Sequence, residues 1–538
     1  MNPLEFIGPA LEIVFSAQNL LLIFIGLLIG VVVGTIPGLT VTMGVILLLP
    51  FTYGLDSAAS AIILLMAVYC GGVYGGSISA ILLNMPGGVS SIATTFDGYP
   101  RAQKGEAYKA LNVALFSSVF GGIFSSIVLL LLTSFIAQFV GRFASPEYFA
   151  LGILGIALVA GVSGNSLPKA IIGALIGIFI ANIGLDVVTG VPRFTFGSRT
   201  LQHGVSLLPT MVALIALTQV VLKTQDFVVN KGALGNIVHL DKKGMTRKEA
   251  KSIIPACIRS SALASFVGAM PGVGACVAQF LCYNEVRRAS KRPQDFGKGS
   301  LEGIAAAESC SNSVAGSALV PLLTLGIPGD GVTALLLGAF VLHGVQPGPA
   351  MFTTHGVTAY SIMIGKLVTA VMLILIGILF TRIVSKIVRV RYSYLVPVIV
   401  TFCFAGAFAS TGHIREITIA AGILIFSYFL NVLKISVVPL MLGMILADIM
   451  ERNFVTSMMA HDNNLLVFFQ RPISLVILLL TVVLTWSLIR VNKKVMRIVE
   501  AETNAEAEAT AEAETTAEEQ SNSQTEDIAE EAKDTDPN

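Results

Sequence analysis

Long apolar runs separated by short polar stretches follow one another along almost the whole chain of 538 residues. In the first part they fall at 20–36, 58–85, 110–139, 149–162, 168–183 and 205–222. After a polar interval they resume at 260–270, 303–327, 332–345, 357–380, 394–408, 417–433, 436–449 and 473–489. Many of these runs approach the ~20 residues that a helix needs to cross a bilayer, and the shorter ones suit half-helices or re-entrant hairpins. The pattern predicts an all-α polytopic membrane protein with about eleven to fourteen membrane segments.

Composition supports the same class of protein. Hydrophobic residues make up 54% of the chain, Asp, Glu, Lys and Arg together only 12%, and the mean hydropathy is +0.81. Such a composition excludes a soluble fold. Nucleic-acid binding is disfavoured as well, because the basic residues are scattered among apolar runs instead of forming a face with interleaved aromatic residues.

The formal net charge of +1 conceals two parts of opposite sign. The C-terminal stretch 501–538 contains thirteen acidic residues and one Lys, which leaves 33 basic and 20 acidic residues in the rest of the chain. A membrane body with an excess of thirteen positive charges suits contact with anionic lipid on the cytoplasmic side. The acidic tail has too few large apolar residues to form a core, so we expect solvated disorder and favour a solubilising role over partner docking.

Basic residues also predict the topology. The first hundred residues contain no Lys or Arg, whereas eight lie in 223–259 and four follow the last apolar run, at Arg490, Lys493, Lys494 and Arg497. Because positive loops stay in the cytoplasm, the linker and the C-terminus are predicted inside and the N-terminus outside. The missing basic residues before the first run are untypical of a cleavable signal peptide, so the first span is expected to be retained.

The cysteines indicate neither disulfides nor a metal site. All six lie in or beside apolar stretches, without a CxxC pair or a His at ligand spacing, at Cys70, Cys257, Cys276, Cys282, Cys310 and Cys403. No metal or organic cofactor is therefore expected.

Comparison of the chain with itself reveals an internal repeat. Four short strings of the first half return in the same order in the second half: 34–38 (GTIPG) as 268–272 (GAMPG), 76–77 (GS) as 316–317, 84–88 (NMPGG) as 326–330 (GIPGD), and 206–209 (SLLP) as 436–439 (SVVP). Duplicated halves are common in transporters, so the order of the matches points to duplication.

The predicted topology makes this an inverted repeat. A first half that starts outside and ends inside crosses an odd number of times, so its copy must run in the opposite direction. A further apolar run at 473–489, without a counterpart in the first half, then returns the C-terminus to the cytoplasm. We predict a first transmembrane repeat over 1–222, a basic cytoplasmic linker over 223–259, a second repeat over 260–468, an extra C-terminal helix over 469–500 and the acidic tail over 501–538.

The repeated strings carry Pro-Gly pairs inside apolar runs. Proline removes an amide donor and clashes with the preceding turn, and glycine tolerates positive φ, so each pair tends to stop a helix at bilayer depth. Where broken helix ends face a cavity, their free N–H groups suit an anion. We favour a substrate centre over simple close packing and name as candidates Pro37, Gly38, Asn84, Pro86, Gly87, Pro271, Gly272, Pro328 and Gly329.

The run 71–77 (GGVYGGS) interrupts the middle of a long apolar stretch with glycine. Close helix packing through small residues is one explanation. Backbone exposed to a ligand, with Ser77 donating a hydrogen bond, is the other, and it makes Gly75, Gly76 and Ser77 candidate binding residues. The run is not a P-loop, because no Gly-Lys-Ser/Thr follows it.

A polar string at 308–313 (ESCSNS) lies inside an apolar run of the second half. Glu308, Ser311 and Asn312 are candidates for holding a proton or a sodium ion, and Asn312 and Ser313 for contacting the substrate. Interhelical hydrogen bonding is the competing account. For Lys366, alone in another apolar run, we favour a side chain that reaches toward the membrane surface over a buried counter-charge.

Taken together, these strings resemble the large membrane subunit of the tripartite tricarboxylate transporter family, the TctA-like proteins. The resemblance rests on the segments 34–50, 74–88, 97–100, 306–329 and 337–349 and extends over most of 19–489. One departure is the string AAESCSNS at 306–313, where the family usually reads closer to Ala-Pro-Glu-Ser/Ala-Ala-Asn-Asn-Ala. Glu308 and Asn312 are retained.

The resemblance implies a permease of the bacterial inner membrane that works with a small four-helix membrane subunit and a periplasmic solute-binding protein. It implies secondary active uptake of citrate or a related carboxylate, driven by a proton or sodium gradient. A transporter or channel for another small anion is the alternative. An integral-membrane enzyme is disfavoured, because the chain has no GxSxG, HExxH or GxGD arrangement.

Overall fold

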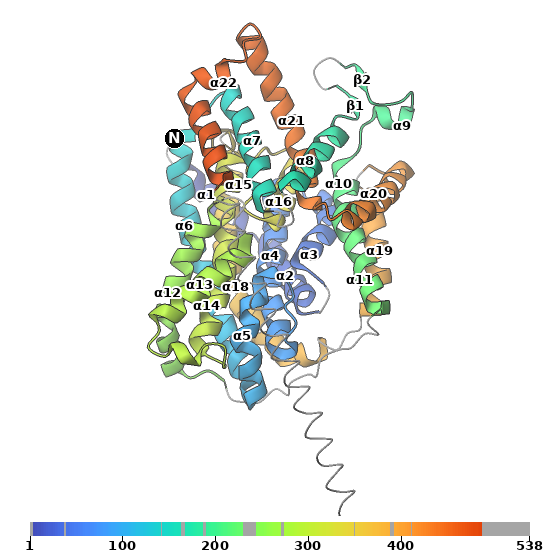
Figure 1. Cartoon of the computed structure of the whole chain (residues 1–538). Coiled ribbons are helices and arrows are strands. Elements are labelled where there is room, and N and C mark those ends of the chain that lie inside the picture. The colour runs from blue at the N-terminus through green and yellow to red at the C-terminus, as the bar shows by residue number, and fades with distance from the viewer. Residues whose placement is uncertain are drawn as a thin grey trace, which may run out of the picture. The chain divides into compact units, whose positions relative to one another are not determined.

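The computed structural model describes residues 4–36, 39–140, 143–162, 167–186, 190–229, 244–270, 274–348, 350–387, 392–409 and 411–486, and almost all of its regular structure is helical (Figure 1). The first half contains α1 (Leu4–Val14), α2 (Ala17–Thr35), α3 (Val41–Leu48), η1 (Leu49–Gly54), α4 (Ala58–Leu83), η2 (Val89–Ser91), α5 (Ile92–Arg101), η3 (Ala102–Glu106), α6 (Ala107–Val140), α7 (Ser145–Val162), α8 (Leu167–Ala181), the antiparallel strands β1 (Gly184–Leu185) and β2 (Pro192–Arg193), α9 (Arg199–Gln202), α10 (Leu207–Met211), η4 (Val212–Leu217) and α11 (Thr218–Val229).

The second half contains α12 (Arg247–Gly268), α13 (Gly274–Ala289), η5 (Pro293–Asp295), α14 (Leu301–Ser317), α15 (Leu319–Leu325), α16 (Gly331–Leu342), α17 (Met351–Thr354), α18 (Gly356–Ile387), α19 (Tyr392–Ala409), α20 (Ile414–Val432), α21 (Val437–Ala460) and α22 (Val467–Gln470). This architecture confirms the predicted all-α polytopic class.

Six helical segments of the described chain are long and apolar enough to cross a membrane: Ala17–Thr35, Ala58–Leu83, Val89–Ile136, Leu207–Gln225, Gly356–Phe380 and Ile414–Val432. Shorter apolar helices occur at Val41–Gly54, Pro168–Ala181, Gly331–Leu342, Val396–Ala409 and Pro472–Trp486. The last of these begins the predicted extra C-terminal helix; its end and the acidic tail lie outside the described residues.

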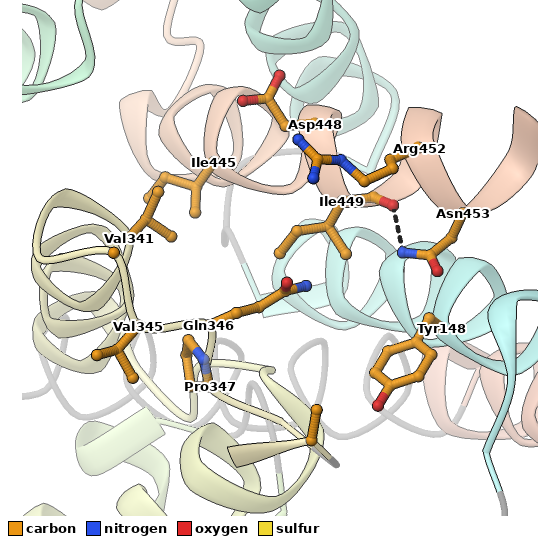
Figure 2. A pocket seen from close by; sticks show the side chains of 12 residues that line it. Tyr148, Val341, Val345, Gln346, Pro347, Ile445, Asp448, Ile449, Arg452 and Asn453 are labelled. Atoms are coloured by element: carbon orange, nitrogen blue, oxygen red, sulfur yellow. Dashed lines mark hydrogen bonds between the residues drawn. The ribbon is translucent and has the colours of Figure 1, made fainter. Parts of the chain in front are cut away.

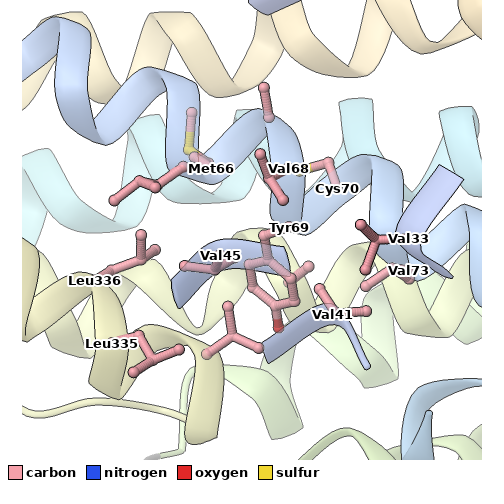
Figure 3. Packing of buried hydrophobic residues seen from close by; sticks show 14 of the residues in the cluster. Val33, Val41, Val45, Met66, Val68, Tyr69, Cys70, Val73, Leu335 and Leu336 are labelled. Atoms are coloured by element: carbon pink, nitrogen blue, oxygen red, sulfur yellow. The ribbon is translucent and has the colours of Figure 1, made fainter. Parts of the chain in front are cut away.

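Helix α4 lies at the centre of the packing. Every residue from Ala59 to Leu83 is buried, which is unusual for a helix of this length. Figure 3 shows side chains of α4, among them Met66 and Tyr69, packed against Val41 of α3 and Leu335 of α16. The central helix thus touches elements of both predicted halves, and residues Met1–Thr485 form a single compact unit.

The repeated strings make equivalent contacts in the two halves. Gly34, at the end of α2, lies against the backbone of Gly72 in α4, where a side chain would overlap the carbonyl group. Gly268, the matching glycine at the end of α12, lies against the backbone of Val314 in α14. Gly72 and Val314 are separated by the same 242 positions as the NMPGG and GIPGD strings. This correspondence supports duplication, while the inverted orientation of the two copies stays a prediction.

The helices that precede two of the Pro-Gly pairs also end in the same way. Asn84 ends α4 with φ 56°, and Gly326 ends α15 with φ 71°, both in the left-handed region. In each case the N–H of the following residue donates to the carbonyl oxygen six positions earlier. Both bonds satisfy a carbonyl group that would otherwise be left without a partner at the helix end.

The predicted linker 223–259 is helical at both ends, because α11 extends to Val229 and α12 begins at Arg247; residues 230–243 lie outside the described part. Thr246 and Glu249 form a capping box at the start of α12, and Lys109 of α6 forms an ion pair with Glu249 at 3.1 Å. The N–H and hydroxyl of Thr246, with Lys109, lower the pKa of Glu249 to about 2. This pairing attaches the basic end of α12 to the start of α6.

Candidate substrate and cation-coupling site

The carboxylate of Glu308 lies completely buried where α4, α5, α6 and α14 meet. Ser77 Oγ of α4 donates a hydrogen bond to Glu308 Oε2 at 2.6 Å, and Ser118 Oγ of α6 donates to the same oxygen at 3.0 Å. Thr94 Oγ1 of α5 donates to Oε1. Both carboxylate oxygens are therefore held by hydroxyl groups from three other helices.

No Lys, Arg or His of the described chain forms an ion pair with Glu308. An ionised carboxylate without a counter-charge is costly in a buried site, and hydroxyl donors offset only part of that cost. The site can lower its charge by taking up a proton, or by holding a small cation among its carboxylate and hydroxyl oxygens. Sequence reasoning named Ser77 and Glu308 separately; the structure brings them together and adds Thr94 and Ser118.

A second polar group lies one helical turn along α14. Ser311 Oγ donates to the carbonyl oxygen of Ser90 at 2.7 Å and accepts a hydrogen bond from Gln279 Nε2 at 2.5 Å. Gln279 also donates to the Ser90 carbonyl and accepts from the N–H of Ala93 at 3.2 Å. These groups connect α14, α13 and the segment that follows the second Pro-Gly pair, as the interhelical hydrogen-bonding account predicts.

Asn312 and Ser313 differ in how well their polar atoms are satisfied. Ser313 Oγ donates to the Gly121 carbonyl oxygen of α6 at 3.1 Å, which is a packing contact. Asn312 is 1% exposed, and its Nδ2 has no hydrogen-bond partner in the described chain. An unpaired buried amide costs free energy, so this donor is available for a ligand.

The glycines of α4 pack against α2 and the turn after α4. A side chain on Gly75 would overlap the Val31 carbonyl oxygen, and one on Gly76 would lie 2.7 Å from Ser91 Oγ. Gly87, of the second Pro-Gly pair, donates its N–H to the Gly76 carbonyl at 3.3 Å. The close-packing explanation therefore accounts for Gly75 and Gly76, and Ser77 is the member of the run that faces the Glu308 carboxylate.

All four Pro-Gly pairs lie between consecutive helices. Pro86 is exposed and Gly87 buried in the turn between α4 and η2, whereas Pro328 and Gly329 are both buried between α15 and α16. The remaining candidates, Pro37, Gly38, Pro271 and Gly272, lie outside the described residues, between α2 and α3 and between α12 and α13. The helices thus break where the sequence predicts.

The breaks meet at two levels of the bundle. Gly34, just before the first break, and Gly87, in the second, lie against each other beside Gly76, next to Ser77 and the Glu308 carboxylate. Gly268, just before the third break, and Gly329, in the fourth, lie against Ser317 and Ala318, nine to ten positions beyond Glu308, which corresponds to about 14 Å. The described residues at and beside the breaks are thus divided between two neighbourhoods.

Lys366 of α18 contradicts the expectation of a side chain that reaches toward the membrane surface. It is 0% exposed and among the largest completely buried side chains of the described protein. Its Nζ has no hydrogen-bond partner there, and it would lie 3.7 Å from a methyl group placed on Gly122 of α6. Only tertiary packing decides this, since the apolar sequence around a single lysine is the same in either case.

A cavity of about 510 Å³ lies away from these residues, between α7, α21 and the turn after α16 (Figure 2). It is lined by Tyr148, Val341, Gly344, Val345, Gln346, Pro347, Ala350, Ile445, Asp448, Ile449, Arg452 and Asn453. None of the residues proposed from sequence lines it. Asp448 lies at the end of the apolar run 436–449 and Arg452 follows it, which is the signal that sequence reasoning passed over.

The family model of the tripartite tricarboxylate transporter TctA family matches residues 20–442. This range includes all four Pro-Gly pairs and Glu308. The chain belongs to this family. It is therefore a multi-pass membrane subunit of a tripartite transporter, a kind of system that includes partner subunits.

Two proteins of Agrobacterium vitis are similar to this family member. An uncharacterised 52.8 kDa protein in the TAR-I ttuC' 3' region is 31% identical over 476 residues, which are 88% of this chain and 94% of the relative. An uncharacterised protein in the TAR-II ttuC' 3' region is 32% identical over 212 residues, 39% of this chain and 87% of the relative. No solved structure matches the chain.

Proposed function

We propose that this TctA-family protein carries out secondary active uptake of a citrate-like tricarboxylate across the bacterial inner membrane, driven by a proton or sodium gradient. It acts with a small four-helix membrane subunit and a periplasmic solute-binding protein that delivers the substrate. The C-terminus lies in the cytoplasm. Family membership supports the carboxylate class, and the absence of a P-loop agrees with a cycle driven by an ion gradient.

The single observation that carries the proposal is the buried Glu308 carboxylate with its three hydroxyl donors. Glu308 takes up the coupling cation, and Ser77, Thr94 and Ser118 hold it. Because these groups come from α4, α5 and α6, a change in the charge of Glu308 alters the contacts between helices. That dependence is what coupling requires: the cation must bind one arrangement of the helices better than another.

The substrate carboxylates bind near the helix breaks, where the Asn312 amide offers a hydrogen bond and helix N-termini favour an anion. The two halves then move relative to one another and expose the site to either side in turn. Ser77 acts on the cation rather than directly on the substrate, which refines the expectation from sequence.

Reconstitution tests the proposal. The full chain and both partners are placed in proteoliposomes, and uptake of radiolabelled citrate is measured while proton and sodium gradients are imposed one at a time. We expect accumulation with one of the two gradients and none without a gradient. Equal fluxes in both directions that do not saturate would instead indicate a channel, and no accumulation across a panel of carboxylates would refute the proposal.

A further inference from the structure

The 510 Å³ cavity lies far from the end of α6 that lies beside Arg101 and carries Lys109. Helix α6 begins beside Arg101 and Lys109 and runs for 34 residues, a length of about 50 Å, before α7 begins. Tyr148, in the first turns of α7, therefore lines the cavity far from the basic end of α6. Lys109 pairs with Glu249 at the end of the basic linker, and because that linker is predicted to be cytoplasmic, we place the cavity toward the side from which substrate arrives.

The cavity also borders the fourth helix break. Pro347, which lines it, places its carbonyl oxygen 2.8 Å from where a side chain on Gly326 would lie, and the N–H of Gly348 donates to the Leu323 carbonyl at 3.1 Å. The turn that forms one wall of the cavity is thus packed directly on the helix end before Pro328.

The lining supplies the basic group that both broken-helix regions lack. Arg452 of α21 forms no ion pair with any described residue, because its neighbour Glu451 is paired with Arg193, and Asp448, one turn earlier, forms none either. Figure 2 shows Asp448, Arg452 and Asn453 on one side of the cavity and Gln346 on the other. The Asn453 amide is already used, since it donates to the Ile449 carbonyl at 2.8 Å.

These groups suit a specific kind of ligand. A guanidinium offers a planar pair of donors that matches one carboxylate. A second carboxylate of the ligand gains nothing from Asp448, which repels it, but a hydroxyl group can donate a hydrogen bond to Asp448. The volume falls within the 300–1,000 Å³ typical of small-molecule sites, and the isoleucine and valine side chains supply the apolar walls.

We propose that this cavity is an outward-facing binding site for a hydroxylated carboxylic acid, in which Arg452 holds a carboxylate and Asp448 accepts a hydrogen bond from the hydroxyl group. The site receives substrate before it moves on to the helix breaks, and it rests on the uptake function proposed above. Gln346 opposes Arg452 and supplies an amide to a further ligand oxygen.

Equilibrium binding to the purified full-length chain in lipid nanodiscs tests the site without the binding protein, whose own specificity would dominate uptake. Two pairs of probes differ only in one hydroxyl group: citrate with tricarballylate, and malate with succinate. We expect R452Q to raise the Kd of all four by about 10- to 100-fold, the effect of losing a charge-assisted hydrogen-bond pair. R452K keeps the positive charge but lacks the planar pair of N–H donors, so it should recover part of the affinity.

Asp448→Asn separates the two roles. It should weaken binding of citrate and malate by about tenfold and leave tricarballylate and succinate within about twofold. The matched control is Arg199→Gln, an exposed arginine of α9 that does not line the cavity and should leave every Kd unchanged. Arg452 and Asp448 are both exposed, so their variants are expected to keep the melting temperature of the unaltered chain.

The possible outcomes separate failure of the proposed cavity site from failure of the proposed uptake function. Citrate binding that R452Q leaves unchanged refutes the site, as does a D448N effect of equal size on probes with and without the hydroxyl group. If the reconstituted complex accumulates citrate but the chain in nanodiscs binds none, the site is again refuted while the uptake function stands. If the complex accumulates no carboxylate at all, the proposed function fails and the site fails with it.

Discussion

Replacement of Glu308 by Gln tests directly whether its buried carboxylate couples a cation to transport. The substitution keeps the shape of the side chain but removes the charge. Of the three hydroxyl groups that donate to Glu308, those that face the new NH2 group can reorient to accept from it, and those that face the amide oxygen continue to donate, because a hydroxyl both donates and accepts. The loss is the difference between charged and neutral hydrogen bonds, about 1 kcal/mol each or about 3 kcal/mol in all, and removal of a buried charge offsets it.

Folding should therefore survive, whereas coupling should not. Each coupled proton that moves down one pH unit supplies 1.36 kcal/mol, which sustains about tenfold accumulation of substrate. In proteoliposomes with both partners, E308Q should no longer accumulate citrate when a pH gradient is imposed, or when a sodium gradient is imposed if sodium is the coupling ion. Exchange of labelled for unlabelled citrate at equal concentrations needs no net movement of the cation, so it should continue.

The matched control is Glu302→Gln, in the first turn of the same helix, where the carboxylate forms no ion pair with any described residue. It should leave both accumulation and exchange unchanged. Gradient-driven accumulation by E308Q at the level of the unaltered protein would refute the coupling role. An unfolded E308Q variant would show instead that the carboxylate is structural, in disagreement with the balance of energies above.

Two further substitutions test the packing. Lys366→Met replaces a buried amine that has no hydrogen-bond partner in the described chain by an apolar side chain of similar size, so the melting temperature should stay equal or rise. Uptake should fall at least tenfold, because ionisable groups inside membrane helices usually serve transport. Full uptake would mean that the amine serves no function. Gly75→Ala introduces a methyl group against the Val31 carbonyl and should destabilise the detergent-solubilised protein by about 1–3 kcal/mol or more. Its control, Gly422→Ala, has open space and should not destabilise it; equal melting temperatures for these two variants would contradict the close-packing explanation.

Much of the candidate site could be identified one residue at a time. Glu308 is conspicuous because an ionisable group in an apolar run is rare, and Ser77 because it ends a run of glycines. That these two residues share a hydrogen bond could not be predicted, since they are 231 positions apart. Thr94 and Ser118 gave no signal at all, because single hydroxyl residues are ordinary in membrane helices.

The sequence alone determined the class of protein, the positions of the helix breaks and the family, because these depend on local properties. Apolar runs specify membrane helices, and proline with glycine stops a helix wherever it occurs. Tertiary structure decided which face of each helix is buried: it enclosed Lys366 and brought Arg452 of α21 beside the turn that follows α16. The physical reason is that lipid and protein interior are equally apolar, so a membrane helix can face either with the same composition, and only the contacts between helices distinguish the two.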